Sequence, residues 1–487
     1  MREIQLIDTT VRDGNQSLWA TRMTTAEALP ALEKMDAAGF LHLDVHSALH
    51  VDVCVRYLKE NPWERIRMMA ARIRRTPRRM GFRSGNITGF STRLPDDFVD
   101  LWVQKWREHG IDVFWCHDGL IDIDNIGRNV SFVKRHGGTG VAPLTFTESP
   151  VHTDELYAQK TRDVIARYGA DAIMIKDSAG LLTVDRARTL VPAILAAAGG
   201  VPVEIHSHCV TGLGPLVCLE AVKLGVDRVH TAIGPLADGA SHPSAATMIR
   251  NLRTLGYRVN VDVDLVEQVS QYFLAIAKRT GRPIGAPAHY DAFHYRHQVP
   301  GGMLANFRAQ LKEAGMLNKL EAVLEEVSRV RVDLGWVLMV TPFSQLVGVQ
   351  AMLNVITGER YKVVPDEVKR YVLGHYGKPP AQIDPDVLDR IVANGSKAIP
   401  ELPEAPAPVV PLLRTKYPKA SDEERILRYL FEQRFVDQML AAGPIRADEA
   451  SFSLRNPVVY LLEQIGRRPP VKRIHITRGE ESIELVQ

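Results

Sequence analysis

The chain has 487 residues, with 60 Lys and Arg against 57 Asp and Glu, a formal net charge of +3 and 45% hydrophobic residues. This balance excludes wholesale disorder and gives no electrostatic reason to expect a nucleic-acid partner. Its 4 cysteines are too few for a disulfide scaffold, so we expect reducing surroundings and a cytoplasmic location. The N-terminus lacks a signal-peptide core, and no apolar run reaches the roughly 18 residues that a membrane span needs.

Short β-rich runs alternate with amphipathic helical stretches over residues 1–300, with a spacing of roughly 25–35 residues. The expected strands begin at Ile4, Phe40, Ile66, Ile111, Gly140, Ala172, Pro202 and Arg228. Eight βα units predict an α/β fold, a TIM (β/α)8 barrel, rather than an open doubly wound sheet.

The β signal fades after the barrel. Residues 301–398 contain successive amphipathic stretches that end near Gly, which predicts a helical second domain. Residues 399–411 are Pro-rich and predict an extended linker. Residues 412–487 predict a small C-terminal α+β tail, with one amphipathic helix and a hairpin.

Polar residues stand where several barrel strands end, the place where TIM barrels carry their active sites. His206 and His208 are two positions apart on one strand, so both imidazoles point to the same face and could bind one metal ion. Two buried, hydrogen-bonded histidines are the alternative. Asp13 could be a metal ligand or a helix N-cap, and Lys176 could be functional or simply salt-bridged.

Further imidazoles are expected near the same rim. For each of them a plain polar contact is the favoured interpretation. They are His46, His50, His117 and His242.

Several long collinear stretches resemble the carboxyltransferase subunits of biotin-dependent enzymes. That family includes the oxaloacetate decarboxylase α chain, the transcarboxylase 5S subunit and the central domain of pyruvate carboxylase. The resemblance covers nearly the whole chain and implies a TIM barrel followed by a helical funnel domain. The matching stretches include DTTVRDGNQSLWATRM, FRSGNITGF, TFTESPVHT, IKDSAGLL, HSHCVTGLG, HQVPGGM and VTPFSQLVGVQAMLNVITGERYK.

The resemblance also implies a divalent metal site. The ligands implied by motif are Asp13, a carbamylated Lys176, His206 and His208. Carbamylation turns a lysine ammonium, which cannot bind a cation, into an oxygen anion that can. Two imidazoles and two oxygen ligands suit Zn, Mn or Co.

A 2-oxo acid such as pyruvate is the implied substrate. Arg12, Gln16 and Arg83 are the residues expected to bind it, since a guanidinium can clamp a carboxylate through two hydrogen bonds. Phe90 stands where the family has a substrate-contacting tyrosine.

The chain departs from the family pattern on the substrate and biotin side. Ala240 replaces a threonine thought to pass a proton between biotin and the enolate, and His242 replaces a glutamine. Cys209 takes the last position of the HxHD pattern, and Trp115 stands where strand 4 usually carries an arginine. A histidine or Cys209 could replace the missing proton carrier.

Together these features predict a metal-dependent carboxyltransferase-like subunit that acts on a 2-oxo acid or a related small carboxylate. No Met-Lys-Met biotinylation motif occurs, so carboxybiotin is expected on a separate carrier chain, with a separate biotin carboxylase. A homodimer is expected. A biotin-independent metal-dependent decarboxylase or C–C lyase is the second hypothesis, and an inert scaffold subunit of a carboxylase complex is the third.

Overall fold

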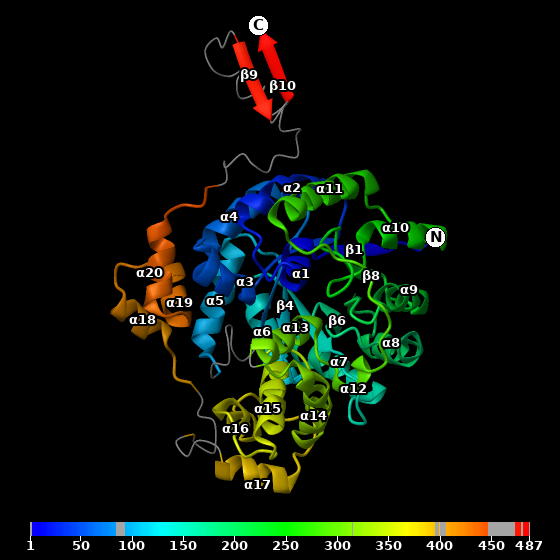
Figure 1. Ribbon diagram of the computed structural model, residues 1–487, viewed down its shortest axis with the longest axis vertical. Coiled ribbons are helices and arrows are strands. Elements are labelled where there is room, and N and C mark those ends of the chain that lie inside the picture. The colour runs from blue at the N-terminus through cyan, green and yellow to red at the C-terminus, as the bar shows by residue number, and fades with distance from the viewer. Residues whose placement is uncertain are drawn as a thin grey trace.

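The computed structural model describes residues 2–83, 93–313, 315–394, 399, 406–446, 473–478 and 481–486. Eight parallel strands close into a barrel in chain order, and helices surround it (Figure 1). The barrel closes between β8 and β1, where Ile7 pairs with His230. The predicted TIM barrel is confirmed. Its strands are β1 Gln5–Asp8, β2 His42–Ser47, β3 Arg78–Arg83, β4 Val113–His117, β5 Thr139–Thr145, β6 Ala172–Asp177, β7 Val203–Ser207 and β8 Arg228–Thr231.

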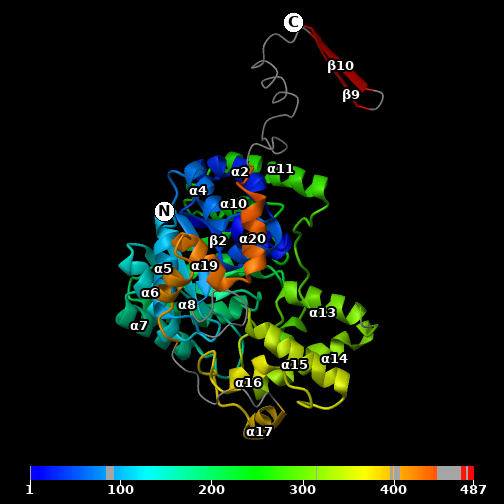
Figure 2. The same cartoon turned by 90° about the vertical axis from the view of Figure 1, so that its left-hand side faces the viewer.

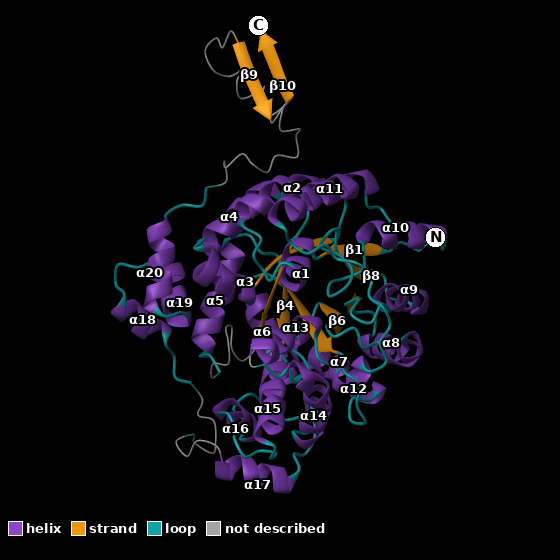
Figure 3. Cartoon of the chain, in the orientation of Figure 1, coloured by secondary structure: helices purple, strands orange, loops and turns teal. Residues whose placement is uncertain are grey.

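Helices form a layer outside the strands (Figure 3). This layer comprises α2 Thr25–Ala37, α3 Ala48–Val53, η2 Cys54–Leu58, α4 Pro62–Arg72, α5 Asp96–Glu108, α6 Ile123–Arg135, α7 Asp154–Tyr168, α8 Val184–Ala198, α9 Gly214–Leu224, α10 Ala245–Thr254 and α11 Val263–Thr280. Two short helices, η1 Thr10–Gly14 and α1 Asn15–Leu18, follow β1 and lie at the end of the barrel instead.

The third strand lies later in the chain than the sequence pattern indicated. The prediction of a strand from Ile66 is wrong, because these residues form α4. The Asn61 side chain caps the helix by accepting from the backbone of Trp63 and Glu64, and Pro62 fits its first turn. The strand itself, β3, follows the basic stretch that comes after the helix.

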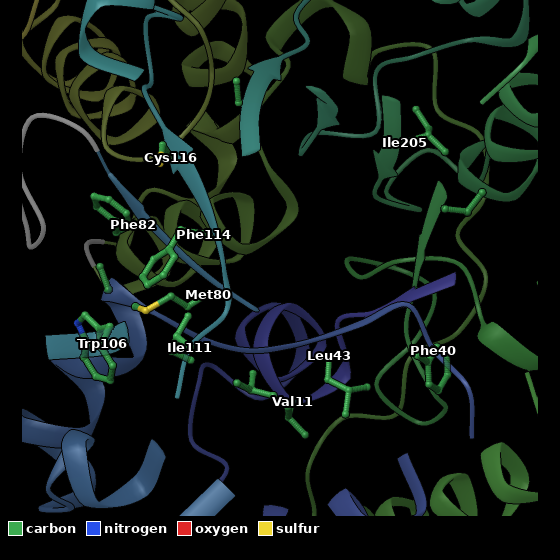
Figure 4. Close-up of a cluster of buried hydrophobic side chains, with 14 of the residues drawn as sticks. Val11, Phe40, Leu43, Met80, Phe82, Trp106, Ile111, Phe114, Cys116 and Ile205 are labelled. Atoms are coloured by element: carbon green, nitrogen blue, oxygen red, sulfur yellow. The ribbon is translucent and has the colours of Figure 1, made fainter. Parts of the chain in front are cut away.

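The main hydrophobic core lies between the strands and the helices, because outward-facing residues alternate with inward-facing ones. Phe82 of β3 and Phe114 of β4 pack edge to face at 6.2 Å, near Trp106 of α5 (Figure 4). The inward positions of β3 include Arg79, which bonds Glu204 across the barrel. The interior of the barrel therefore holds a buried ion pair beside an apolar cluster that includes Val113 and Trp115.

A helical region follows the barrel and has its own core. Arg331 donates to the Thr147 hydroxyl at 2.8 Å and to the Glu148 carbonyl at 2.9 Å, both just after β5. This contact places the helical region against the carboxyl end of the barrel, beside the strand ends. Its helices are α12 His294–His297, α13 Gly301–Glu313, η3 Leu317–Lys319, α14 Leu320–Asp333, α15 Phe343–Thr357, α16 Asp366–Val372 and α17 Pro385–Asn394.

The chain then returns to the barrel. Helices α18 (Val410–Lys416), α19 (Asp422–Leu430) and α20 (Gln433–Ala442) bury side chains in the barrel core, and α19 and α20 pack on α5 and η2 (Figure 2). The pattern predicted one helix here. The structure has two, because the backbone at Phe431 is extended.

Residues 400–405 of the expected linker lie outside the described residues, and its last two residues, 410–411, are not extended as expected because they begin α18. Near the C-terminus, β9 (Arg473–Arg478) and β10 (Glu481–Val486) pair antiparallel. Within the described parts of the chain, no helix is both long and apolar enough to cross a bilayer.

Candidate metal centre

Asp13 lies just past β1, in the short helix η1, with its carboxylate close to the end of β7. Its Oδ2 is 3.4 Å from Nε2 of His206 and 3.5 Å from Nε2 of His208. Nε2 of His242 approaches the same oxygen at 3.1 Å. Potential ligand atoms of these four buried residues all lie within 4.8 Å of one another. The structure thus brings together three of the four predicted ligands and adds His242.

Arg12 keeps the Asp13 carboxylate ionised. Its guanidinium is 2.8 Å from Asp13 and bonds Asp44 at 2.8 Å on its other side. Burial alone would raise the pKa of Asp13, but the charge of Arg12 outweighs it and holds this pKa well below the usual range. An anionic oxygen therefore faces the three imidazoles.

The orientation of His206 is fixed by a relay through the barrel interior. Nε2 of His230 is 3.1 Å from a Glu204 carboxylate oxygen, which only accepts, so this nitrogen carries the hydrogen. Nδ1 of His230 then accepts from Nδ1 of His206 at 3.2 Å. Nε2 of His206 is left with a lone pair and no hydrogen-bond partner in the described structure.

Two contacts lock Glu204 in place within this relay. Arg79 donates to both of its carboxylate oxygens, at 3.0 and 2.7 Å, and both side chains are fully buried. Burial opposes the ionised form of Glu204, yet the charge of Arg79 lowers its pKa below the usual range. Glu204 therefore stays anionic and accepts from His230.

His208 and His242 are oriented by backbone carbonyls. Nδ1 of His208 donates to the Ala240 carbonyl at 2.7 Å, and Nδ1 of His242 donates to the Ser207 carbonyl at 3.2 Å. In a neutral imidazole the other nitrogen, Nε2, is then a lone-pair donor. All three rings present this atom to Asp13.

The loop after β8 carries His242 to the site. The amide of Asp238 donates to the His242 carbonyl at 2.8 Å, and the amide of Cys209 donates to the Ser241 carbonyl at 2.7 Å. These bonds tie the loop to itself and to the end of β7. A residue distant in sequence from His206 thereby enters the same cluster.

Lys176, the fourth predicted ligand, lies on β6 opposite His206 in the sheet register. Its ammonium bonds the Ser178 hydroxyl and lies 5.7 Å from the centre of the Trp115 ring. Burial lowers the pKa of Lys176 to about 8. Lys176 therefore has more neutral amine, the form that reacts with CO2, near neutral pH than a solvent-exposed lysine has.

This donor set fits a divalent cation. A buried carboxylate and buried imidazole nitrogens without hydrogens converge on one point, and the Nε2 of His206 has no other partner. Such nitrogen and oxygen donors suit Zn2+ and related first-row metals.

The predicted substrate residues lie around the same barrel end. Arg83 ends β3, opposite His117 of β4. Burial lowers the pKa of Arg83 to about 10, although the negative charge of Asp52 acts to raise it. Burial also lowers the pKa of His117, and the nearby cations Lys176 and Arg83 lower it further. Two cationic side chains, Lys176 and Arg83, therefore lie at this barrel end and can attract an anion. Gln16 lies on α1, partly exposed, and Phe90 lies outside the described residues.

Cys209 and Ala240 flank the cluster without joining it. Cys209 is buried, and burial raises the pKa of its thiol, so the thiol stays protonated. Ala240 contributes only its carbonyl, to His208. His46 is not at the rim as expected, because its ring lies 5.1 Å from that of Trp106 in the helix layer. His50 follows β2 at this barrel end, with Nδ1 2.8 Å from the Ser47 hydroxyl and Nε2 3.4 Å from the Asn15 amide, outside the cluster.

Sequence reasoning missed the roles of Glu204, His230 and His242. Glu204 shares its strand face with His206 and His208, so the alternation along β7 pointed to it. His230 offered only the weaker signal of a histidine near the end of β8. For His242 the replacement of a usual glutamine by an imidazole was the available signal.

Known proteins share this architecture. The chain is 39% identical over 483 residues to a pyruvate carboxylase subunit of Methanocaldococcus jannaschii, covering 96% of this chain and 84% of the relative. The chain belongs to the carboxyltransferase family of pyruvate carboxylase. It is also 32% identical to the methylmalonyl-CoA carboxyltransferase 5S subunit of Propionibacterium freudenreichii, covering 94% of this chain and 95% of that one.

Two further comparisons agree with this membership. Residues 295–448 match the family described as the conserved carboxylase domain. The carboxyl transferase domain of Rhizobium etli pyruvate carboxylase, solved with pyruvate and biocytin, superposes with a TM-score of 0.82. That match has 25% identity and covers 94% of this chain and 81% of the other. The resemblance inferred from the sequence motifs is confirmed.

Proposed function

We propose that this carboxyltransferase transfers a carboxyl group between carboxybiotin and a small 2-oxo acid of the pyruvate class. The observation that carries the proposal is the convergence of Asp13, His206 and His208 beside Lys176, at the carboxyl end of a family barrel. Biotin would arrive on a separate carrier chain, loaded by a separate biotin carboxylase. Two copies of this chain would form a homodimer.

The two cationic side chains at this barrel end support an anionic substrate. Arg83 would bind the substrate carboxylate through its planar fork, with Gln16 as a hydrogen-bonding partner. Arg12, although engaged with Asp13 and Asp44, adds positive potential where an enolate oxygen develops. A bound divalent cation would supply Lewis acidity to the substrate oxygens.

The residues of the chain have separate tasks in this proposal. The relay from Glu204 through His230 holds one imidazole in a single orientation. Lys176 would carry a carbamate, whose oxygen completes the ligand set. The aromatic ring of Trp115 lies beside both Arg12 and Lys176 and limits the access of water to them.

Reconstitution tests the proposal. The chain is mixed with a biotin carboxylase, a biotinylated carrier, ATP and labelled bicarbonate, and label in the 2-oxo acid product is counted. We expect label that depends on pyruvate or 2-oxoglutarate, is blocked by avidin, and disappears in Asp13→Ala and in the double His206→Ala, His208→Ala variant. Arg83→Lys should raise KM, since it keeps the charge but loses the fork.

Ala240 favours a second candidate, a biotin-independent lyase or decarboxylase on the same site. A methyl group cannot shuttle the proton that the family threonine is thought to pass, and the thiol of Cys209 is held protonated. In the same assay this candidate predicts turnover of a 2-oxo acid by the chain alone, insensitive to avidin. A scaffold subunit would show neither activity and would bind its partners equally well after Asp13→Ala.

A further inference from the structure

We infer that His242 is a direct metal ligand, so that the centre has three imidazoles rather than the pair that the family motif supplies. The inference concerns the same site as the proposed function but does not require carboxyl transfer. It rests on the hydrogen positions around the cluster and on the packing of the rings.

The Nδ1 atom of each imidazole in the cluster already forms a hydrogen bond. His242 donates from Nδ1 to the Ser207 carbonyl at 3.2 Å, and a carbonyl cannot donate in return. Nε2 of His242 then holds a lone pair, 3.1 Å from Oδ2 of Asp13. Two lone pairs facing each other at this distance in a buried site repel unless a cation lies between them.

A proton cannot account for the whole cluster. Nε2 of His206 and Nε2 of His208 approach the same Asp13 oxygen, at 3.4 and 3.5 Å. One protonated ring would satisfy one of the three contacts and leave the others as lone pairs facing an anion. A divalent cation accepts all of these donors at once.

The three rings surround a common point. The centre of the His242 ring is 4.2 Å from that of His206 and 4.2 Å from that of His208. Both of the other rings therefore pack directly against the ring of His242. His242 is fully buried, and its loop is anchored by the bond from the Cys209 amide to the Ser241 carbonyl.

A third imidazole changes which metals the centre prefers. Imidazole ligands suit Zn2+ and Co2+, whereas Mg2+ and Mn2+ favour oxygen. We therefore expect this centre to select Zn2+ or Co2+ over Mn2+ more strongly than a centre with two imidazoles does.

X-ray absorption at the zinc edge of the unmodified, Zn2+-loaded protein tests the inference without any substitution. The multiple-scattering features of imidazole give the number of histidine ligands. Three imidazoles support the inference. A count of two imidazoles would overturn the inference, and so would a failure of the protein to bind Zn2+.

The variant His242→Gln provides the second test, with His152→Gln as a control at a buried histidine outside the cluster. Zn2+ affinity is measured by competition with a chromophoric chelator, and the ligand field of Co2+ by visible absorption. We expect His242→Gln to weaken Zn2+ binding at least about tenfold and to shift the Co2+ spectrum, and the control to do neither. Glutamine can still hydrogen bond Asp13, so unchanged affinity and spectrum would mean that His242 only supports the carboxylate.

If His242→Gln fails to fold, the number of histidine ligands measured by X-ray absorption on the unmodified protein still tests the inference. Failure of the proposed function is distinguishable from failure of this inference. A centre with three imidazoles but no carboxyl transfer leaves the inference standing and removes the proposed activity.

Discussion

Trp115 of β4 fills the space that Gly81 of β3 leaves empty. The two residues are partners in the sheet register, and a Cβ built at Gly81 would lie 1.9 Å from the Trp115 ring. The indole nitrogen lies 3.3 Å from Asp44, and the ring lies 4.9 Å from the Arg12 guanidinium. The absent side chain of Gly81 therefore sets the position of an aromatic ring that packs against Arg12 and Asp44, and Arg12 in turn forms salt bridges to Asp13 and Asp44.

Gly81→Ala should destabilise the barrel by overpacking. The added methyl group forces the Trp115 ring from its place, at a cost of about 1–3 kcal/mol in the free energy of unfolding. Urea denaturation measures this cost. The cost should be smaller when Trp115→Leu is already present, because the ring that clashes is gone. An equal cost in both backgrounds would contradict the packing relationship.

His230→Leu should weaken metal binding without removing a ligand. The substitution breaks the relay from Glu204, so the imidazole of His206 loses the acceptor that fixes its hydrogen on Nδ1. We expect a loss of roughly 10–100-fold in Zn2+ affinity, measured by chelator competition. His230→Gln is the matched control. Its amide can donate to Glu204 and accept from His206, so it should retain most of the affinity.

Lys176→Ala should abolish activity, because the carbamate oxygen is lost. Added bicarbonate or a short carboxylic acid should restore part of it, by placing an oxygen anion in the vacated space. Lys176→Arg is the control, since it keeps a positive charge but cannot form a carbamate. Product formation is followed with and without the added acid. A fully active Lys176→Ala variant would reduce Lys176 to an ion-pairing role.

Ala240→Thr should raise carboxyl exchange between carboxybiotin and the 2-oxo acid. The new hydroxyl supplies the proton carrier that the chain lacks, and general acid–base catalysis of this kind is worth about 10²–10⁴ in rate. The unmodified protein should show weak exchange, measured as oxaloacetate decarboxylation that depends on free biotin. Strong exchange without the substitution would show that Ala240 is no obstacle.

The protein should lose stability as the pH falls below about 6.5. Burial lowers the pKa of His152 to about 3 and that of His297 to about 4, so the folded chain does not take up protons that the unfolded chain binds. Unfolding is therefore increasingly favoured on acidification, by up to about 1.4 kcal/mol per pH unit for each such histidine. Protonation of His297 would also remove its acceptor bond from the Val299 amide, at 3.0 Å.

Urea denaturation at a series of pH values measures this slope. His152→Gln should make it shallower between pH 6.5 and 4, whereas the same change at the exposed His289 should leave it as in the unmodified protein. Equal slopes for His152→Gln and the unmodified protein would show that burial of this histidine does not contribute to acid sensitivity.

The sequence by itself determined the barrel fold and the positions of the expected metal ligands at the strand ends. Alternating strand and helix patterns are local, so they revealed the βα repeat and placed Asp13, Lys176, His206 and His208 at strand ends. The prediction of a strand at Ile66 is wrong for a local reason. Apolar residues there repeat with helical spacing, and the Asn61 side chain caps the helix.

Only the tertiary structure determined which other side chains lie next to these residues. The loop that brings His242 to Asp13 follows a path set by backbone bonds to the end of β7, and no periodicity encodes that path. The relay from Glu204 to His206 likewise depends on how β7 and β8 face each other inside a closed barrel. Residue patterns report the face of an element, whereas the convergence of side chains from different elements depends on barrel closure and loop anchoring.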